Sequence, residues 1–115
     1  MTKPRRPFAP AAKSAAYFRV FSYAVSVSRE RAFRRTYGPS GAWTRLFDKA
    51  DGYLGTQLLA RRDRDNEYLT IDAWTSEAAW LAFIASFGPQ YRRLSGKYRR
   101  LYRTEREVGS FATFS

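Results

Sequence analysis

The sequence predicts a single α+β domain with the element order strand, helix, strand, strand, helix, strand, and three observations support this prediction. Runs rich in aromatic and β-branched residues indicate strands near the start, in the middle and at the end of the chain. Between these runs, apolar residues recur every three or four positions, which is the period of a helix with one buried face. A chain of 115 residues, 44% of them hydrophobic, has enough apolar material for one core.

The first half of the chain is expected to form one strand and two helices. Residues 17–27 are rich in Tyr, Phe and Val and are long enough for a complete strand. Ser28 is a favourable N-cap for a helix that ends at Gly38-Pro39. A short second helix is expected over residues 40–50, because apolar residues recur there at positions i, i+3 and i+4. The two helices together make the first crossover.

The second half begins with a predicted hairpin. Residues 52–62 and 67–74 alternate in the manner of strands, and the polar segment 63–66 supplies the turn between them. A last strand is expected over residues 105–114.

The final helix is expected between the hairpin and the last strand. Thr75 or Ser76 caps it, and its apolar stripe is interrupted at Gly88-Pro89 before it resumes as far as Leu101. The complete order is the split β-α-β arrangement of ferredoxin-like folds, in which helices cover one face of an antiparallel sheet.

One face of such a sheet has no helix on it. Tyr53, Tyr68 and Trp74 are expected on this open face, which they make too aromatic to suit water. A second copy of the chain is the simplest cover, so we predict a homodimer that packs sheet against sheet.

The charge of the chain is strongly positive and unevenly placed. There are 21 basic and 10 acidic residues, which give a formal net charge of +11. Residues 1–16 combine scattered cations with prolines and no apolar period, so we expect a flexible basic tail before a domain over 17–115. A basic stretch over 89–103 also carries tyrosines, and this combination is the observation that supports nucleic-acid binding. The simpler interpretation, which we favour over nucleic acid as a partner, is a solvated helix face.

The residue types that are missing exclude several kinds of chemistry. The chain has no cysteine and no histidine, which excludes disulfides, thiolate catalysis, the usual zinc sites and any Ser/His/Asp triad. We therefore expect neither a metal nor another cofactor. The sequence has no apolar run of about 20 residues and no secretory signal, so we expect no membrane partner and a cytoplasmic location.

Several motifs resemble one known family. They are Tyr37-Gly38-Pro39, then Trp43 with Leu46-Phe47, then GYLGTQLL at 52–59 and YLTIDAW at 68–74. The chain resembles the antibiotic-biosynthesis-monooxygenase-like (ABM) members of the dimeric α/β-barrel superfamily, over nearly everything outside the tail. The resemblance implies two ferredoxin-like subunits packed sheet to sheet, each with a pocket between its sheet and its helices. Members of this family include cofactor-free oxygenases, haem-degrading enzymes that hold iron through a histidine, and proteins with no established reaction.

Asp72 is the strongest candidate for a catalytic residue. Strand alternation places it on one face with Tyr68, Thr70 and Trp74. A carboxylate in a half-buried aromatic setting has a raised pKa and can act as a base toward a phenol. The alternative is a structural role for Asp72, either as the partner of an arginine such as Arg19 or as a cap for a backbone group.

Four aromatic residues are candidates for ligand contact: Trp74, Tyr23, Tyr53 and Tyr68. Their alternative role is to fill the core or a dimer interface. Three functions therefore remain open. The first is a cofactor-independent monooxygenase, or a related enzyme, acting on an aromatic or polyketide-like compound. The second is a non-catalytic homodimer that binds small molecules or other proteins, and the third is a basic nucleic-acid-associated protein.

Overall fold

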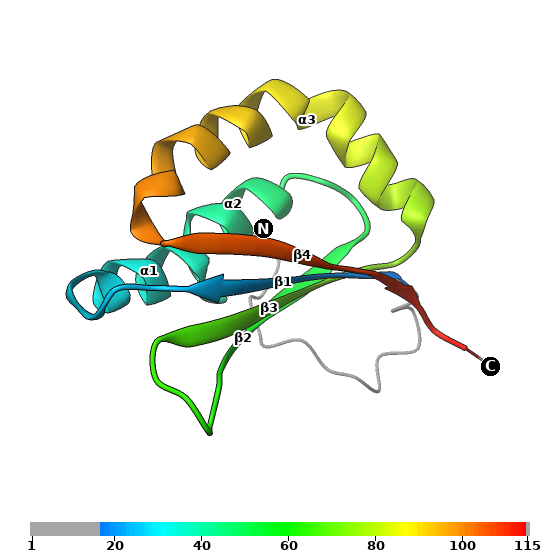
Figure 1. The fold of residues 1–115 in the computed structure, drawn as a ribbon. Coiled ribbons are helices and arrows are strands. Elements are labelled where there is room, and N and C mark those ends of the chain that lie inside the picture. The colour runs from blue at the N-terminus through cyan, green and yellow to red at the C-terminus, as the bar shows by residue number, and fades with distance from the viewer. Residues whose placement is uncertain (1–16, 115) are drawn as a thin grey trace.

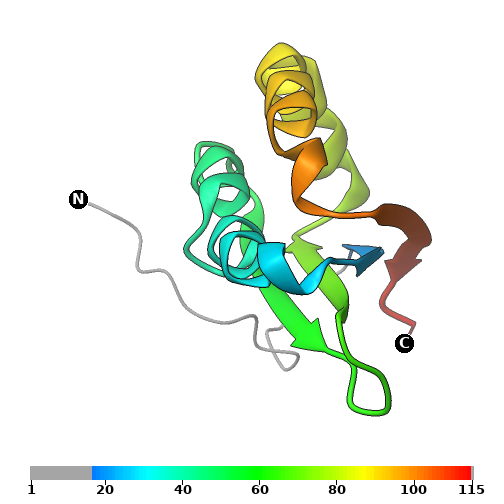
Figure 2. The ribbon, with the colours of Figure 1, turned by 60° about the vertical axis from the view of Figure 1, so that its left-hand side comes forward.

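The computed structural model describes residues 17–114, so the predicted tail over 1–16 lies outside the described residues. Four strands form one antiparallel sheet in the order β2-β3-β1-β4, and the helices lie together on one side of it (Figures 1 and 2). The elements are β1 (Tyr17–Ala24), α1 (Glu30–Tyr37), α2 (Ala42–Phe47), β2 (Tyr53–Ala60), β3 (Glu67–Trp74), α3 (Glu77–Tyr98) and β4 (Thr104–Ala112). This order and topology confirm the predicted ferredoxin-like fold.

Two boundaries near the start of the chain differ from the prediction. The first strand ends at Ala24, because Val27–Arg29 forms a 3-10 turn that leads into α1. Ser28 lies in that turn, so the expectation that it caps the first helix is wrong; Arg29 precedes α1 without a side-chain cap.

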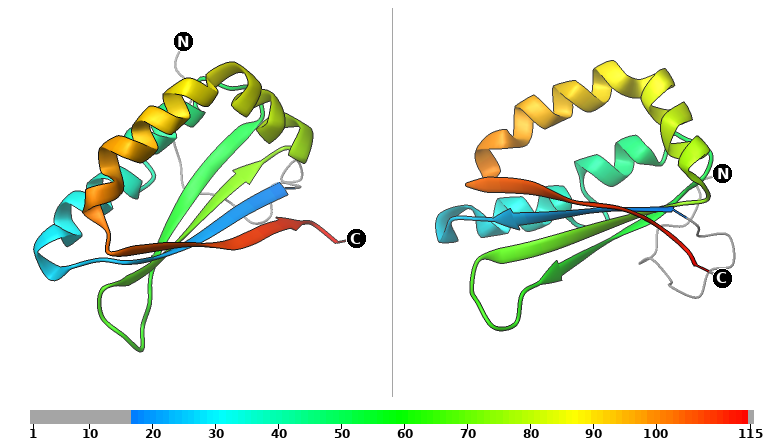
Figure 3. Two further views of the ribbon diagram at one scale, coloured as in Figure 1. Left: turned by 45° about the horizontal axis from the view of Figure 1, so that its top comes forward. Right: turned by 45° about the vertical axis from the view of Figure 1, so that its right-hand side comes forward.

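The last helix consists of two helical arms joined at a kink. Ser76 is its N-cap, since the Ser76 hydroxyl accepts a hydrogen bond from the Ala79 amide at 3.1 Å. The predicted interruption appears as a kink, where Phe87 leaves helical geometry two residues before Pro89. Proline causes such a kink because it lacks an N–H and its ring collides with the preceding turn. Figure 3 shows the two arms of α3 passing over the sheet.

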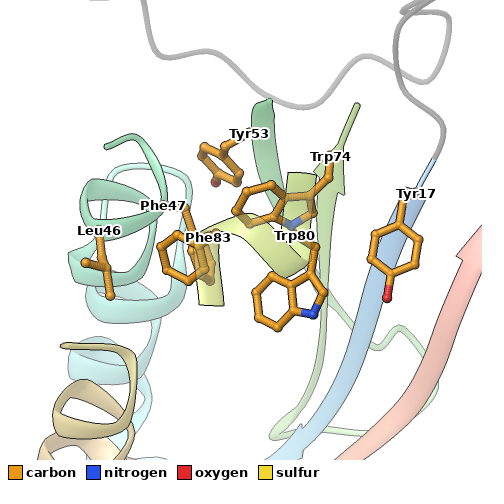
Figure 4. Close-up of a cluster of buried hydrophobic side chains, with 7 residues drawn as sticks. All are labelled: Tyr17, Leu46, Phe47, Tyr53, Trp74, Trp80 and Phe83. Carbon is orange, nitrogen blue, oxygen red and sulfur yellow. The ribbon is translucent and has the colours of Figure 1, made fainter. Parts of the chain in front are cut away.

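The core lies between the sheet and the helices, and it is almost entirely aromatic. One cluster, drawn in Figure 4, consists of Tyr17, Leu46, Phe47, Tyr53, Trp74, Trp80 and Phe83. A second cluster consists of Tyr23, Val25, Phe33, Tyr37, Tyr68 and Leu101. Ring centroids within both clusters lie mostly 4.5–6 Å apart, in the stacked, tilted and edge-on arrangements that aromatic pairs prefer.

The expectation that Tyr53, Tyr68 and Trp74 face the open side of the sheet is wrong. All three lie on the helix-covered face, with 3%, 4% and 0% of their surface exposed. Alternation correctly places Tyr68 and Trp74 on one face, but it does not say which face the helices cover. The open face is mainly aliphatic instead and includes Leu69 and Ile71.

A β-bulge in β2 changes which residues share a face. Tyr53 pairs with Trp74, but the next paired residue is Gly55, opposite Ala73. One extra residue is therefore present in β2, so Tyr53 and Thr56 both point toward the helices although they are three positions apart. Gly55 has a φ of 138°, a conformation that residues with a side chain rarely adopt.

We predict opposite effects on stability for two glycine-to-alanine substitutions. A Cβ at Gly41, between α1 and α2, would lie 2.1 Å from the Thr36 carbonyl oxygen, so Gly41→Ala should lower the free energy of unfolding by roughly 1–3 kcal/mol. A Cβ at Gly96 in α3 meets nothing within 4 Å, so Gly96→Ala should raise it by up to about 1 kcal/mol. Urea unfolding followed by tryptophan fluorescence measures both. Equal effects of the two substitutions would contradict the described approach of α1 to Gly41.

Candidate active site

A cavity of about 70 Å³ lies between the sheet and the helix layer. Its walls are mostly aromatic and come from both strands and helices: Phe21, Tyr23, Tyr37, Trp43, Phe47 and Tyr91. Five polar residues complete it: Thr56, Thr70, Asp72, Ser95 and Glu105. Apolar walls with a few converging polar groups are typical of small-molecule sites.

Asp72 lies on β3, where the antiparallel register places it opposite Arg19 of β1 and Thr56 of β2. The Thr56 hydroxyl donates a hydrogen bond to Oδ1 of Asp72 at 2.6 Å. Burial raises the pKa of Asp72 to about 6, although the hydrogen bond from Thr56 and the charge of Arg19 both lower it. Asp72 is therefore mostly ionised at neutral pH but binds a proton far more readily than an exposed aspartate.

Arg19 does not form the ion pair with Asp72 that was considered as an alternative. No contact within 4.0 Å joins the two charged groups in the part of the chain that the structure describes. The Arg19 guanidinium instead lies 4.0 Å from the centre of the Trp80 ring, and its Nη1 is 3.9 Å from Glu107. The Arg19 side chain is only 14% exposed, so its positive charge acts on the cavity with little screening by water.

Glu105 of β4 forms a second polar centre. It accepts hydrogen bonds from the Tyr23 hydroxyl at 2.8 Å and from the Tyr102 hydroxyl at 3.3 Å. Burial, followed by the negative charge of Glu105, raises the pKa of Tyr23 far above its ordinary range. Tyr23 therefore remains a neutral phenol whose proton is directed at Glu105.

The predicted site residues occupy three different places. Asp72 and Tyr23 both line the cavity. Tyr53 lies behind it, with its hydroxyl hydrogen-bonded to that of Thr56, and Trp74 is enclosed in the aromatic core. Tyr68 lies toward the other end of the sheet, where its hydroxyl bonds Glu30 and Arg34. Ligand contact by Tyr53, Trp74 and Tyr68 stays a prediction.

Sequence reasoning missed several residues that line the cavity, of which Tyr91 and Glu105 are the most informative. Tyr91 lies in the helical apolar stripe after the kink, a position that predicts burial but not a cavity. Glu105 is next to Tyr23 only because β4 pairs with β1, so no local pattern reveals it. Glu105 lies directly opposite Tyr23 in that register, so only knowledge of the pairing between β1 and β4 would have identified it.

The basic part of α3 carries its cations on the solvent side and turns its tyrosines mainly toward the core, although the Lys97 ammonium lies 5.3 Å from the centre of the Tyr98 ring. Arg92, Arg93 and Lys97 are exposed, whereas Tyr91 and Tyr98 pack against the two core clusters. A cation-aromatic surface for single-stranded nucleic acid needs both on the same side. The arrangement favours a solvated helix face.

No group of three or more acidic residues, histidines or cysteines among the described residues is placed to hold a metal ion. None of the described helices is long and apolar enough to span a bilayer.

Comparison with known proteins supports the resemblance stated from the motifs. The sequence profile of the antibiotic biosynthesis monooxygenase (ABM) family matches residues 42–94, which run from α2 into α3 and include Asp72. No curated protein sequence matches the chain significantly.

Solved structures give matches over nearly the whole chain. SnoaB, a cofactor-independent oxygenase from Streptomyces nogalater, is 26% identical, with 88% of this chain and 95% of that protein covered and a TM-score of 0.58. A monooxygenase from the ActVA-Orf6 gene of Streptomyces coelicolor, solved with nanaomycin D, is 14% identical, with coverages of 90% and 92% and a TM-score of 0.70. A dimeric ferredoxin-like protein from an uncultured marine organism is 8% identical, with coverages of 88% and 90% and a TM-score of 0.61. The last two matches concern the fold alone.

Replacing Asp72 by asparagine should stabilise the fold at pH 8 and change it little near pH 4. The folded-state pKa of about 6 lies above the ordinary value of about 4, so the folded chain holds this proton more tightly than the unfolded chain. The resulting stability is complete below about pH 4 and is lost as the pH rises through 6. The asparagine variant avoids this loss, which is at most about 3 kcal/mol for two pKa units.

Urea unfolding of wild type and Asp72→Asn at the two pH values measures this difference. Asp65→Asn, at an exposed position in the hairpin turn, is the matched control and should have no comparable effect. A variant that is less stable than wild type at pH 8 would show that the carboxylate is stabilised overall in its charged form.

Proposed function

We propose that this chain, with its match to the antibiotic biosynthesis monooxygenases, is a cofactor-independent monooxygenase that acts on an aromatic, polyketide-like phenol. The observation that carries the proposal is a carboxylate with a raised pKa in an otherwise aromatic cavity. The 26% identity to a cofactor-independent oxygenase over 88% of the chain supports the same reaction class.

The proposed reaction begins with a proton transfer. Asp72 takes a proton from the phenolic substrate, and the nearby guanidinium of Arg19 stabilises the resulting anion. The electron-rich anion then transfers an electron to dioxygen, and the two radicals combine to form a carbon–oxygen bond. The peroxide anion takes the proton back from Asp72, and loss of water from the resulting hydroperoxide converts the reacting ring carbon, a CH2 in the keto tautomer of the substrate, into a carbonyl group. One oxygen atom enters the product, the other leaves as water, and all four electrons come from the substrate.

The cavity limits the size of the substrate part that it can enclose. About 70 Å³ is well below the roughly 300–1,000 Å³ of sites that enclose drug-sized ligands. We propose that only the reacting edge enters in the described conformation, and that a polycyclic ligand displaces the α3 arm after the kink. That arm contributes Tyr91 and Ser95 to the wall.

A non-catalytic small-molecule-binding protein is the second candidate, because the aromatic walls would hold a planar ligand without any reaction. This role uses the same cavity but predicts no oxygen consumption. A cytoplasmic location remains a prediction under either function.

We further propose that the protein acts as a homodimer whose sheets pack together. Leu59 and Phe111 on the open face of the sheet are 39% and 49% exposed, and no described helix covers them. A second copy would cover this apolar surface. The likeness to a dimeric ferredoxin-like protein supports this arrangement.

We predict that the protein consumes oxygen when supplied with a panel of anthrone-type and quinol substrates, with no added metal, flavin or reductant. Asp72→Asn should lower kcat/KM by at least about 100-fold, as expected for loss of a general base. For wild type, kcat/KM should fall about tenfold per pH unit below pH 6, because Asp72 becomes protonated.

An oxygen electrode and product mass spectrometry with labelled dioxygen measure this reaction. Asp65→Asn, far along the hairpin from the cavity, should keep wild-type activity. Tight substrate binding by wild type with no oxygen uptake would favour the binding protein instead.

The dimer prediction is tested separately by light scattering. Wild type should have the mass of two chains, and Leu69→Glu should give a monomer, because it places an unpaired charge in the proposed interface. The matched control is Leu81→Glu, since Leu81 is 56% exposed on α3, away from the open sheet face. A monomeric wild type at high protein concentration would refute the proposed assembly.

A further inference from the structure

We infer that Tyr53 and Thr56 form a hydrogen-bond relay that orients Asp72 and leaves its Oδ2 as the atom that takes the substrate proton. Both are positioning residues, since neither is proposed to touch the reacting atoms. This inference rests on the proposed function for the proton transfer, but the relay itself is a property of the folded chain.

The distances fix the direction of the relay. The Thr56 hydroxyl lies 2.6 Å from Oδ1 of Asp72 and 2.5 Å from the Tyr53 hydroxyl. An ionised carboxylate can only accept a hydrogen bond, so the single Thr56 proton points at Asp72. The Thr56 oxygen must then accept from Tyr53. Hydrogen bonds in such a chain strengthen one another when they are shielded from water, and both residues are only 3% exposed.

The bulge at Gly55 makes the relay possible. In an uninterrupted strand, residues three apart point to opposite faces, so Tyr53 and Thr56 could not meet on the helix side. The extra residue turns Thr56 toward the helices and places it opposite Asp72. The positive φ of Gly55 is therefore the backbone feature on which the relay depends.

The relay distinguishes the two oxygens of Asp72. Oδ1 is held by Thr56, whereas no described hydrogen bond engages Oδ2. The hydrogen bond favours the ionised carboxylate and so opposes the effect of burial on its pKa. The other titratable or charged groups around the cavity are Arg19 and Tyr23 of β1, Tyr37 of α1, Tyr91 of α3 and Glu105 of β4. Among these, only the Arg19 charge also lowers the pKa of Asp72.

The test is a direct titration of the Asp72 carboxyl carbon by NMR in the full chain. Thr56→Val keeps the shape of the side chain but removes the hydroxyl, and it should raise the pKa of Asp72 by about one unit or more. Tyr53→Phe should raise it by a smaller amount, because Thr56 still donates. Thr56→Ser keeps the hydroxyl and should restore the wild-type value.

Thr70→Val is the matched control. Thr70 is also buried in the cavity wall, two residues from Asp72 on the same strand, but no described hydrogen bond joins the two side chains. The same chemical change at Thr70 should therefore leave the pKa of Asp72 close to that of wild type. An unchanged pKa in Thr56→Val would overturn the relay. If Thr56→Val does not fold, the pKa of Asp72 in Tyr53→Phe decides instead, and an unchanged pKa there would overturn the relay.

Activity separates this inference from the proposed function. If both hold, the acid limb of the kcat/KM profile moves to higher pH in Thr56→Val by the shift seen in the titration. A raised pKa in a protein that oxygenates no substrate would retain the relay and reject the monooxygenase. Asp72-dependent oxygenation with no pKa shift in Thr56→Val would retain the monooxygenase and reject the relay.

Discussion

The constraint on which the site depends is the partial burial of one carboxylate beneath an aromatic helix layer. Moving a carboxylate out of water costs several kcal/mol unless hydrogen bonds and charges compensate. Here the compensation is partial, because Asp72 receives one hydrogen bond from Thr56 and a charge from Arg19 that does not touch it. Complete pairing with a positive charge would have kept Asp72 ionised at all ordinary pH values. Without any compensating group, Asp72 would have stayed protonated. The intermediate arrangement gives a group that exchanges protons near neutral pH.

The walls of the cavity are also part of the core. Phe47 packs against Trp74 and Phe83 in one cluster while it lines the cavity, and Tyr91 contacts Trp43 and Trp80 from the kinked arm of α3. A ligand that needs more room must therefore move side chains that hold the helix layer on the sheet. The kink near Pro89 divides α3 at the place where such a movement costs least, because a helix hydrogen bond is already missing there.

Sequence patterns predicted the strands, their order along the chain and the residues that share one face of β3 with Asp72, because these follow from local periodicity. They did not predict which face the helices cover, so Tyr53, Tyr68 and Trp74 were assigned to the wrong side of the sheet. Nor did they predict the bulge, because a glycine within a strand pattern does not say whether an extra residue is present. The patterns did not identify Glu105 as a site residue, because its place beside Tyr23 comes from pairing between strands some 80 residues apart.

A carboxylate at position 72 is harder to explain for a protein that only binds. Asparagine would accept the same hydrogen bond from Thr56 and would carry no charge to bury, so it would hold a neutral planar ligand in a more stable fold. Groups that weaken the fold while tuning a pKa toward neutrality are typical of catalytic sites. The Arg19 charge points the same way, because a positive charge beside the cavity favours an anion within it. A neutral bound ligand has no need of that charge, but a phenol that has just lost its proton does.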